Sequence, residues 1–391
     1  MALDRILLSR FRNHRESAVE GTAQFNLLVG ENGAGKTNVL EAISLLAPGR
    51  GLRRAQLSEM PAQGCDGGFA VSAALAARGG GPVQLGTRGA PRRPWRRGGA
   101  VNGAARGGDP VQLGTGVAPD RPGRRLVQIN GAEAPTARLA EWLSIGWLTP
   151  SMDRLFVDGA SARRRFLDRL VLAASPDHAG HATRLDNALR ERNRLLADER
   201  PPDPRWLDAI EAQIAEAGSA VSQARARMIG QLEGALAALP DSPFARPSIA
   251  YQPGGPAEAG ALADMLRQGR PRDRAAQRTL SGPHRDELRV TMAGKNQPAA
   301  DCSTGEQKAM LIAITLAHSY LLEREGEQRP RLLLLDEVAA HLDPLRREAL
   351  FDRLRSGSAQ VWLTGTELAP FEAIEREAAI WEVSEGAVRR I

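Results

Sequence analysis

The sequence predicts an α/β fold built around a phosphate-binding loop, with a second lobe that is mainly helical. The first observation is the run G-E-N-G-A-G-K-T at 30–37, which lies between a strand-like apolar segment and a helix-like amphipathic segment. The second is a run of leucines at 331–335, which is typical of a fully buried parallel strand and ends in two acidic residues. The third is the segment 207–238, whose apolar residues alternate at three- and four-residue spacing, as in packed helices.

Length and composition are those of an ordinary globular protein with room for one large or two medium domains. The chain has 391 residues, of which 42% are apolar and 25% are charged. Its two cysteines are too few for a disulfide framework. The sequence shows neither a leader-like N-terminus nor an apolar run of membrane-spanning length. We therefore expect a cytoplasmic protein with no membrane partner.

The net charge of +6 is concentrated in one segment. Residues 88–125 hold nine arginines against two aspartates, which leaves the rest of the chain close to neutral. The same segment contains a tandem duplication, because P-V-Q-L-G-T occurs at 82–87 and again at 110–115 with similar flanks. Its Gly, Pro and Arg content predicts a disordered-looking insert at about 79–125, a flexible surface loop. An arm that contacts DNA phosphates is the less favoured alternative.

The phosphate loop predicts nucleotide binding through its backbone and its lysine. Glycines let backbone N–H groups turn inward around phosphate oxygens, and the following helix directs its positive dipole end at the anion. The chain has three lysines against forty-nine arginines, so Lys36 indicates a need for a compact charge on the β- and γ-phosphates. A glycine-rich turn without function is the alternative. The predicted nucleotide ligands in this loop are Gly30, Glu31, Asn32, Gly33, Ala34, Gly35, Lys36, Thr37 and Asn38.

The acidic pair after the leucine run predicts the metal-binding and catalytic part of the same site. The Thr37 hydroxyl and the Asp336 carboxylate are the predicted Mg²⁺ ligands, and Glu337 is the predicted catalytic residue that orients the attacking water. Two solvated acids at the end of a strand are the alternative. The run A-H-L-D at 340–343 follows, and we expect its Asp343 to meet the nucleotide site of a partner.

The run S-T-G-E-Q-K at 303–308 opens a predicted helix and supports two compatible interpretations. Ser303 and Glu306 match a capping box, in which each side chain bonds the backbone of the other. The start of the helix also suits a γ-phosphate, which would be bound by the following residues. They are Ser303, Gly305, Glu306 and Gln307.

These motifs and the periodicity define the expected organisation of the chain. Helices at 185–196 and 207–238 are expected to form a packed hairpin of about 50 Å, at ~1.5 Å per residue. The segment 240–275 is expected to be a loop with one short helix, and strands are expected at 25–29 and 69–75. Residues 1–150 are expected to form the N-terminal part of an ATPase lobe, and residues 151–300 a helical lobe. Residues 301–391 are expected to contain the helix that starts at S-T-G-E-Q-K, called the signature helix below, and the C-terminal part of the ATPase lobe.

In this order the motifs resemble those of ABC/SMC-type ATPase heads, and within that class the chain is similar to the RecF family of bacterial recombination mediators. Three further stretches carry the similarity. They are F-R-N-H at 11–14, L-T-P-S-M-D-R-L-F at 148–156 with S-A-R-R-R-F-L-D-R-L at 161–170, and S-G-P-H-R-D-E-L at 281–288. The similarity covers most of the chain except 79–125.

The resemblance implies a DNA-binding ATPase that uses ATP and Mg²⁺. In ABC-class ATPases the signature run of one subunit binds the γ-phosphate held by the other, so ATP would join two copies into a homodimer. The RecF family further implies binding to double-stranded DNA, at gaps and ss/dsDNA junctions. It also implies action with RecO and RecR to help load RecA in DNA repair and replication restart.

Two departures from the wider class bear on catalysis and on the alternative functions. The signature usually reads L-S-G-G-Q, and transporter ATPases carry a histidine where this chain has Thr364-Gly365-Thr366 after the last core strand. Because that imidazole is missing, we expect at most a weak, DNA-stimulated ATPase used as a switch. The departures disfavour an ATPase subunit of a transporter. The length of the predicted helices disfavours an SMC-like chromosome-structuring ATPase with large tethers, and a scaffold with a vestigial loop is the remaining alternative.

Overall fold

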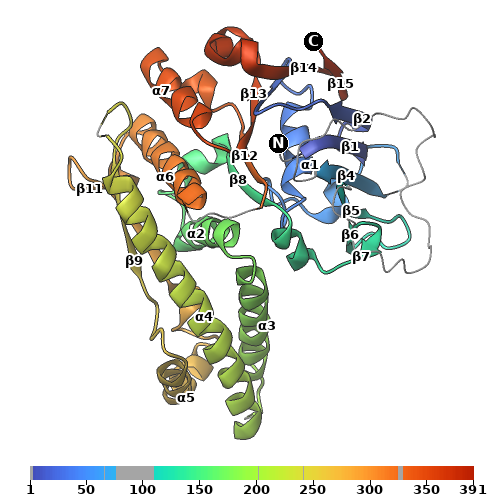
Figure 1. Cartoon of the computed structure of the whole chain (residues 1–391). Helices are drawn as coiled ribbons and strands as arrows, with labels where there is room; N and C mark the ends of the chain where they lie inside the picture. Colours follow the sequence, from blue (N-terminus) through green and yellow to red (C-terminus); the bar gives the residue numbers. More distant parts are fainter. Residues whose placement is uncertain (1–2, 66, 76–109, 201, 241, 325–328) are drawn as a thin grey trace. The chain divides into compact units, whose positions relative to one another are not determined.

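The computed structural model describes residues 3–65, 67–75, 110–200, 202–240, 242–324 and 329–391. By its internal contacts the chain divides into two compact units (Figure 1). Unit 1 is Met1–Pro150 with Gln328–Ile391, and unit 2 is Ser151–Glu327. Among the described residues, no helix is both long and apolar enough to cross a lipid bilayer.

Unit 1 contains a largely parallel sheet that carries the phosphate loop. Its strand order is β15-β14-β3-β13-β12-β8, and every pairing is parallel except β14 with β15. The predicted strand at 25–29 is the central, fully buried β3, and the leucine run at 331–335 is β12. The bounds are β3 Phe25–Val29, β8 Ser144–Leu148, β12 Arg331–Leu335, β13 Gln360–Gly365, β14 Ala378–Ser384 and β15 Ala387–Arg390.

A second, antiparallel sheet of unit 1 has the order β2-β1-β4-β5-β6-β7. The helix that follows the phosphate loop, α1 (Lys36–Ser44), buries Val39, Leu40 and Ile43 in one apolar cluster with residues of both sheets. The other helix of unit 1 is α7 (Pro344–Arg355). The strand bounds are β1 Leu3–Phe11, β2 His14–Glu20, β4 Phe69–Leu75, β5 Val111–Val117, β6 Arg125–Ile129 and β7 Ala132–Glu133.

The expected loop at 79–125 is wrong for residues 111–117. In the second copy of the duplicated run, residues 111–115 lie in β5, which pairs along its whole length with β4. The prediction took the glycines as a sign of a loop, but Gly116 lets β5 lie close to the backbone of β4. A Cβ on Gly116 would lie 2.2 Å from the carbonyl oxygen of Phe69. The first copy, at 82–87, lies outside the described residues.

Unit 2 is mainly helical, and its α3 and α4 form the expected hairpin (Figure 1). At ~1.5 Å per residue, the 34 residues of α4 span about 51 Å. The expectation of a loop with one short helix at 240–275 is right about the single helix and wrong about the rest, because α5 has 17 residues and buries Leu262 and Leu266, and the segment also forms β9. A small antiparallel sheet has the order β11-β10-β9. The bounds are α2 Ala160–Ala174, α3 His178–Leu196, α4 Pro204–Ala237, α5 Ala259–Ala275, α6 Thr304–Arg324, β9 Pro247–Gln252, β10 Glu287–Met292 and β11 Gln297–Pro298.

The units differ from the expected domains at one boundary. The signature helix α6 was expected with the C-terminal part of the ATPase lobe, but its contacts place it in unit 2, where it packs against α4. The reason is its composition, since α6 is buried on most sides and needs helical neighbours. Short 3₁₀ helices complete the fold at Leu57–Glu59, Thr136–Glu141, Pro150–Arg154, Pro283–Arg285, Ala299–Asp301, Ala339–His341 and Ala369–Glu377.

Candidate nucleotide-binding site

The phosphate loop joins the carboxyl end of β3 to the first residue of α1. Because β3 is buried between β13 and β14, the loop starts from a rigid strand. Gly33 and Gly35 have φ values of 84° and 119°, which residues with a Cβ rarely adopt. The first N–H groups of α1 lack helical acceptors and are therefore donors for an anion at the loop.

Lys36 lies beneath the loop with only 4% of its surface exposed. Its Nζ donates to the carbonyl oxygens of Gly30 and Glu31 at 2.6 and 2.8 Å. Burial lowers the pKa of Lys36, and the charges of Glu337 and Asp336 oppose that shift. Within the described part of the chain this ammonium has no ion pair, so an anionic ligand would supply its missing counter-charge.

The two predicted Mg²⁺ ligands are in contact. The Thr37 hydroxyl donates to Asp336 Oδ1 at 2.9 Å, although the two residues are far apart in the sequence. Parallel pairing explains the contact, because the carboxyl ends of β3 and β12 lie at the same edge of the sheet. The Thr364 hydroxyl donates to the same Oδ1, also at 2.9 Å, from the end of β13.

Asp336 is buried, and burial is the main cause that raises its pKa, with the charge of Glu337 adding to the rise. The hydrogen bonds from Thr364 and Thr37 act in the opposite direction. A hydroxyl oxygen and a carboxylate are hard donors of the kind that Mg²⁺ takes, and a magnesium ion would relieve the buried negative charge. The described residues include no cluster of three or more His, Cys, Asp or Glu that fits a metal. The proposed magnesium site has only one residue of these four types, Asp336, because its other ligands would be the Thr37 hydroxyl and phosphate oxygens.

Glu337, the predicted catalytic residue, directly follows Asp336 with a left-handed φ of 54°. Its backbone N–H donates to Thr364 Oγ1 at 2.9 Å. Thr364 therefore fixes both acidic residues, through a donated and an accepted bond. In the sequence this position stands out only by its missing histidine, and no local pattern indicates a role for Thr364.

The remaining predicted ligand of the loop, Asn38, contacts a turn near the N-terminus. Asn38 Nδ2 donates to Asn13 Oδ1 at 2.7 Å, and Asn13 lies in the F-R-N-H run between β1 and β2. In the same run Arg12 makes two bonds to the carboxylate of Glu41 on α1, at 2.9 and 2.8 Å. Arg12 is thus engaged in fixing α1 to this turn.

The signature residues lie at the start of α6 in unit 2. Ser303 N and Oγ both donate to Glu306 Oε2 at 2.9 Å, and Glu306 N donates back to Ser303 Oγ at 3.4 Å, so the predicted capping box is present. A bond from Lys295 is the largest cause that lowers the pKa of Glu306, to about 2. Gln307 is buried and donates to Cys302 O at 2.8 Å. Ser303 and Gly305 are exposed, so they are the signature residues that a ligand can reach.

Asp343 lies in unit 1 as the N-cap of α7. Its Oδ1 accepts a bond from the backbone N–H of Arg346 at 3.0 Å, which is the usual role of an aspartate at this position. Its side chain is also paired with the Arg346 guanidinium at 3.4 Å. The predicted role of Asp343 at a partner's site needs a second copy of the chain and stays a prediction.

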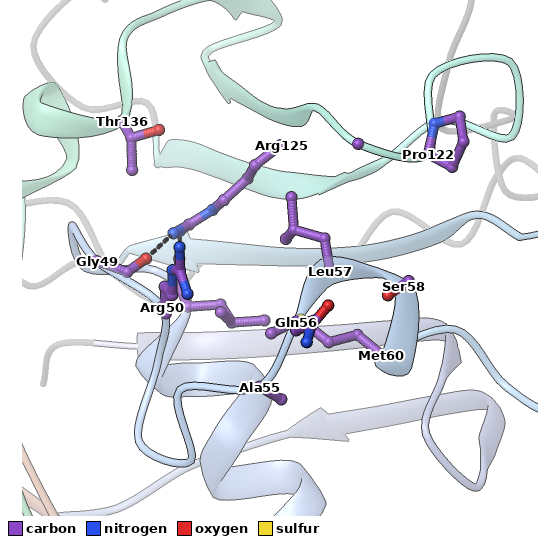
Figure 2. A pocket seen from close by; sticks show the side chains of 12 residues that line it. Gly49, Arg50, Ala55, Gln56, Leu57, Ser58, Met60, Pro122, Arg125 and Thr136 are labelled. Atoms are coloured by element: carbon purple, nitrogen blue, oxygen red, sulfur yellow. Dashed lines mark hydrogen bonds between the residues drawn. The ribbon is translucent and has the colours of Figure 1, made fainter. Parts of the chain in front are cut away.

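A cavity of about 510 Å³ lies at the opposite end of α1 (Figure 2). Arg125, from the end of the expected insert, lines it and bonds the carbonyl oxygens of Gly49, Leu45 and Ala47. Burial lowers the pKa of Arg125 to about 10. This arginine therefore caps the carboxyl end of α1. The cavity is lined by Leu45, Gly49, Arg50, Ala55, Gln56, Leu57, Ser58, Met60, Pro122, Gly123, Arg125 and Thr136.

Comparison with known proteins agrees with this geometry. A family model described as SbcC/RAD50-like, Walker B motif, matches residues 281–356. The DNA replication and repair protein RecF of Mesorhizobium japonicum is 42% identical over 405 residues, covering 99% of this chain and 97% of its own length.

Solved structures extend the comparison to the fold. A structure of the recombination mediator protein RecF-ATP in the RecFOR pathway has a TM-score of 0.80 at 21% identity, covering 100% of this chain and 97% of that one. The Smc head domain of Pyrococcus furiosus has a TM-score of 0.52 at 15% identity, covering 100% and 96%. These likenesses confirm the predicted fold class.

Proposed function

Because this chain belongs to the RecF family of DNA replication and repair proteins, we propose that it is an ATP-dependent, DNA-binding recombination mediator that pairs with a second copy when ATP is bound. One observation carries the proposal. Lys36 and Asp336 are buried opposite charges that form no salt bridge with any described residue, and the Thr37 hydroxyl links the start of α1 to Asp336. A magnesium-bound triphosphate matches this arrangement of charge.

Each residue has a defined task in the proposed site. Lys36 and the N–H groups of Gly33 and Gly35 would hold the β- and γ-phosphates, while Thr37 and Asp336 would hold the metal. When bound, Mg²⁺ neutralises charge on the phosphate oxygens. Glu337 would accept a proton from the attacking water, and Thr364 keeps its backbone in place. No imidazole is supplied after β13, so hydrolysis is expected to be slow and to act as a release switch.

The second copy would complete the site. Ser303 and Gly305 are exposed at the start of the 21-residue helix α6, where the first N–H groups of a helix have no helical acceptor. In the proposed dimer they reach the γ-phosphate held by Lys36 of the other copy, and Asp343 lies at the same junction. ATP then joins the copies, DNA binds the paired form at gaps and ss/dsDNA junctions, and RecO and RecR cooperate in loading RecA.

Sedimentation tests this proposal directly. The protein is run with and without ATP, and with duplex, single-stranded and junction DNA. We expect a monomer to become a dimer with ATP and the dimer to bind junction DNA. Ser303→Arg should bind ATP normally and stay monomeric, and Glu337→Gln should remain dimeric in ATP. A wild-type protein that stays monomeric with ATP and every DNA would contradict the proposal.

A further inference from the structure

Two turns from opposite ends of the sequence hold the same part of the phosphate loop. The carbonyl oxygen of Ala34 accepts one bond from Asn13 Nδ2 at 2.8 Å and another from the backbone N–H of Gly386 at 3.1 Å. The carbonyl oxygen of Gly35 is 3.1 Å from Nε2 of His14. Asn13 and His14 belong to the turn between β1 and β2, and Gly386 belongs to the turn between β14 and β15 (Figure 1).

These bonds fix the direction of two N–H groups that face the phosphate. In a trans peptide the C=O of one residue and the N–H of the next point in opposite directions. Anchoring the Ala34 carbonyl outward therefore turns the Gly35 N–H inward, and anchoring the Gly35 carbonyl does the same for the Lys36 N–H. Because these N–H groups already face the phosphate position, binding an anion costs less conformational entropy than it would in a mobile loop.

The two turns are also joined to each other. Ser17, on β2, donates its one hydroxyl hydrogen to the carbonyl oxygen of Gly386 at 2.9 Å and so links β2 to the C-terminal turn. Because the Gly35 carbonyl only accepts, the hydrogen of the neutral imidazole lies on His14 Nε2, and Nδ1 lies 2.9 Å from Ser17 Oγ without a hydrogen of its own. His14 is fully buried, and Ser17 is nearly so. The link is therefore protected from competition by water.

Gly386 is packed too closely to admit any side chain. Its φ is 78°, and a Cβ there would lie 2.1 Å from the carbonyl oxygen of Asn13 and 3.4 Å from the N of His14. The C-terminal turn thus sits directly against the N-terminal turn, with the phosphate loop bonded to both. A wedge of one methyl group at Gly386 would displace both anchors of the Ala34 carbonyl.

We propose that the turn Glu385–Gly386 is a positioning element of the phosphate loop, so that the C-terminal hairpin β14–β15 sets the affinity of the chain for nucleotide. This inference deepens the proposed nucleotide site and rests on it. Gly386, Asn13 and His14 act on the ligand through the loop, and none of them needs to touch the ligand.

The chain offers a matched control for the test. The turn Asn130–Gly131 between β6 and β7 has φ values of 50° and 81°, against 48° and 78° for Glu385–Gly386. A Cβ on Gly131 would meet nothing within 4 Å. Gly131→Ala and Gly386→Ala therefore impose the same backbone strain, and only Gly386→Ala inserts a wedge against the loop.

The experiment measures the Kd for ATP of the full chain by titration with Mg²⁺ present, together with the urea midpoint of each variant. We expect Gly386→Ala to raise the Kd at least tenfold and Gly131→Ala to leave it within twofold. Hydrogen exchange without nucleotide should become faster at the Gly35 and Lys36 amides of Gly386→Ala while β3 stays protected. A change in global stability alone would not produce that local pattern.

The outcomes separate this inference from the proposed function. Failure of the wild-type chain to bind ATP would overturn the proposed function itself. Normal ATP binding by the wild type together with a Kd within twofold for Gly386→Ala, or equal losses in both glycine variants, would overturn only the positioning role. Where Gly386→Ala does not fold, Ser17→Ala provides the test without a wedge. We expect it to raise the Kd about threefold, and an unchanged Kd would overturn the inference.

Discussion

The buried charges at the centre of unit 2 and those at the phosphate loop of unit 1 differ in what neutralises them. In unit 2, Arg192 is fully buried and pairs with Glu211 at 2.9 Å and Asp273 at 2.7 Å, both also buried. In unit 1, Lys36 and Asp336 are buried almost as deeply, yet their hydrogen bonds within the described chain go to neutral groups. A buried charge that is paired with an opposite charge of the chain indicates a structural role. A buried charge that forms no salt bridge indicates a binding site for a charged ligand.

The largest expected effect is on stability and lies in unit 2. Arg192→Met should lower the free energy of unfolding by about 3 kcal/mol, because buried Asp273 loses its closer cation at 2.7 Å and keeps only the pair with Arg272 at 3.5 Å. Urea denaturation measures the loss. Arg194→Met, on the same helix, is the control, since its pair with Glu191 is exposed to solvent and its loss should cost much less. Equal losses in the two variants would remove the contrast between the units.

The second effect is on ligand affinity and lies in unit 1. Lys36→Met should weaken ATP binding about 100-fold, equivalent to about 2.7 kcal/mol, while the free energy of unfolding is unchanged or higher. Removing a buried ammonium that has only carbonyl partners relieves desolvation, which is why stability is spared. Titration with a fluorescent ATP analogue measures the affinity, and exposed Lys295 supplies the control Lys295→Met. An affinity within twofold of wild type would count against the assignment.

The third effect concerns the metal. Asp336→Asn should abolish most of the Mg²⁺ dependence of ATP binding, about tenfold in affinity, and should stabilise the ligand-free protein at neutral pH. The pKa of Asp336 in the folded chain is raised above 3.8, its value in the unfolded chain. The free energy of unfolding therefore falls as pH rises from 3.8 to the folded-state pKa, and it stays lower at all higher pH values. Unfolding at pH 4 and pH 7 tests the sign. A variant less stable than wild type at pH 7 would contradict it.

The smallest effect is the acid sensitivity of His14. Burial lowers its pKa below 6.5 and outweighs the bonds to the Gly35 and Gly386 carbonyls. The unfolded chain therefore takes up the proton first, so stability should fall as pH drops below about 6.5, by at most ~1.4 kcal/mol per pH unit. His14→Gln should flatten this dependence. The pH profile of urea midpoints measures it, and a profile as steep in the variant as in the wild type would contradict the prediction.

Local patterns predicted the strands, loop and helix that carry the candidate site. The spacing of glycines, the buried strand before them and the leucine run before Asp336 are contained within short stretches, and in the structure Thr37 contacts Asp336. The resemblance to the RecF family is confirmed. The capping box at Ser303 could be recognised for the same reason, because its partners are three residues apart.

What the sequence could not show depends on long-range contact. Asn13, His14 and Gly386 act on the loop only because the two ends of the chain meet, and no local pattern marks that meeting. Composition misled the analysis where glycine or proline occurs inside regular structure, as in β5, and in α5, which contains Pro271. In both segments the packing of apolar residues outweighs the local preference for a loop.

The pairing of β3 with β13 and β14 sets an order of events during translation. The phosphate loop is synthesised long before the strands on both sides of β3 and the Gly386 amide, which come more than 300 residues later in the sequence. At ~5–20 residues per second, roughly 20–70 s separate the loop from these neighbours. Unit 2 is one continuous segment and has all its own contacts sooner. A growing chain therefore has no finished nucleotide pocket until β13, β14 and the turn at Gly386 have been made.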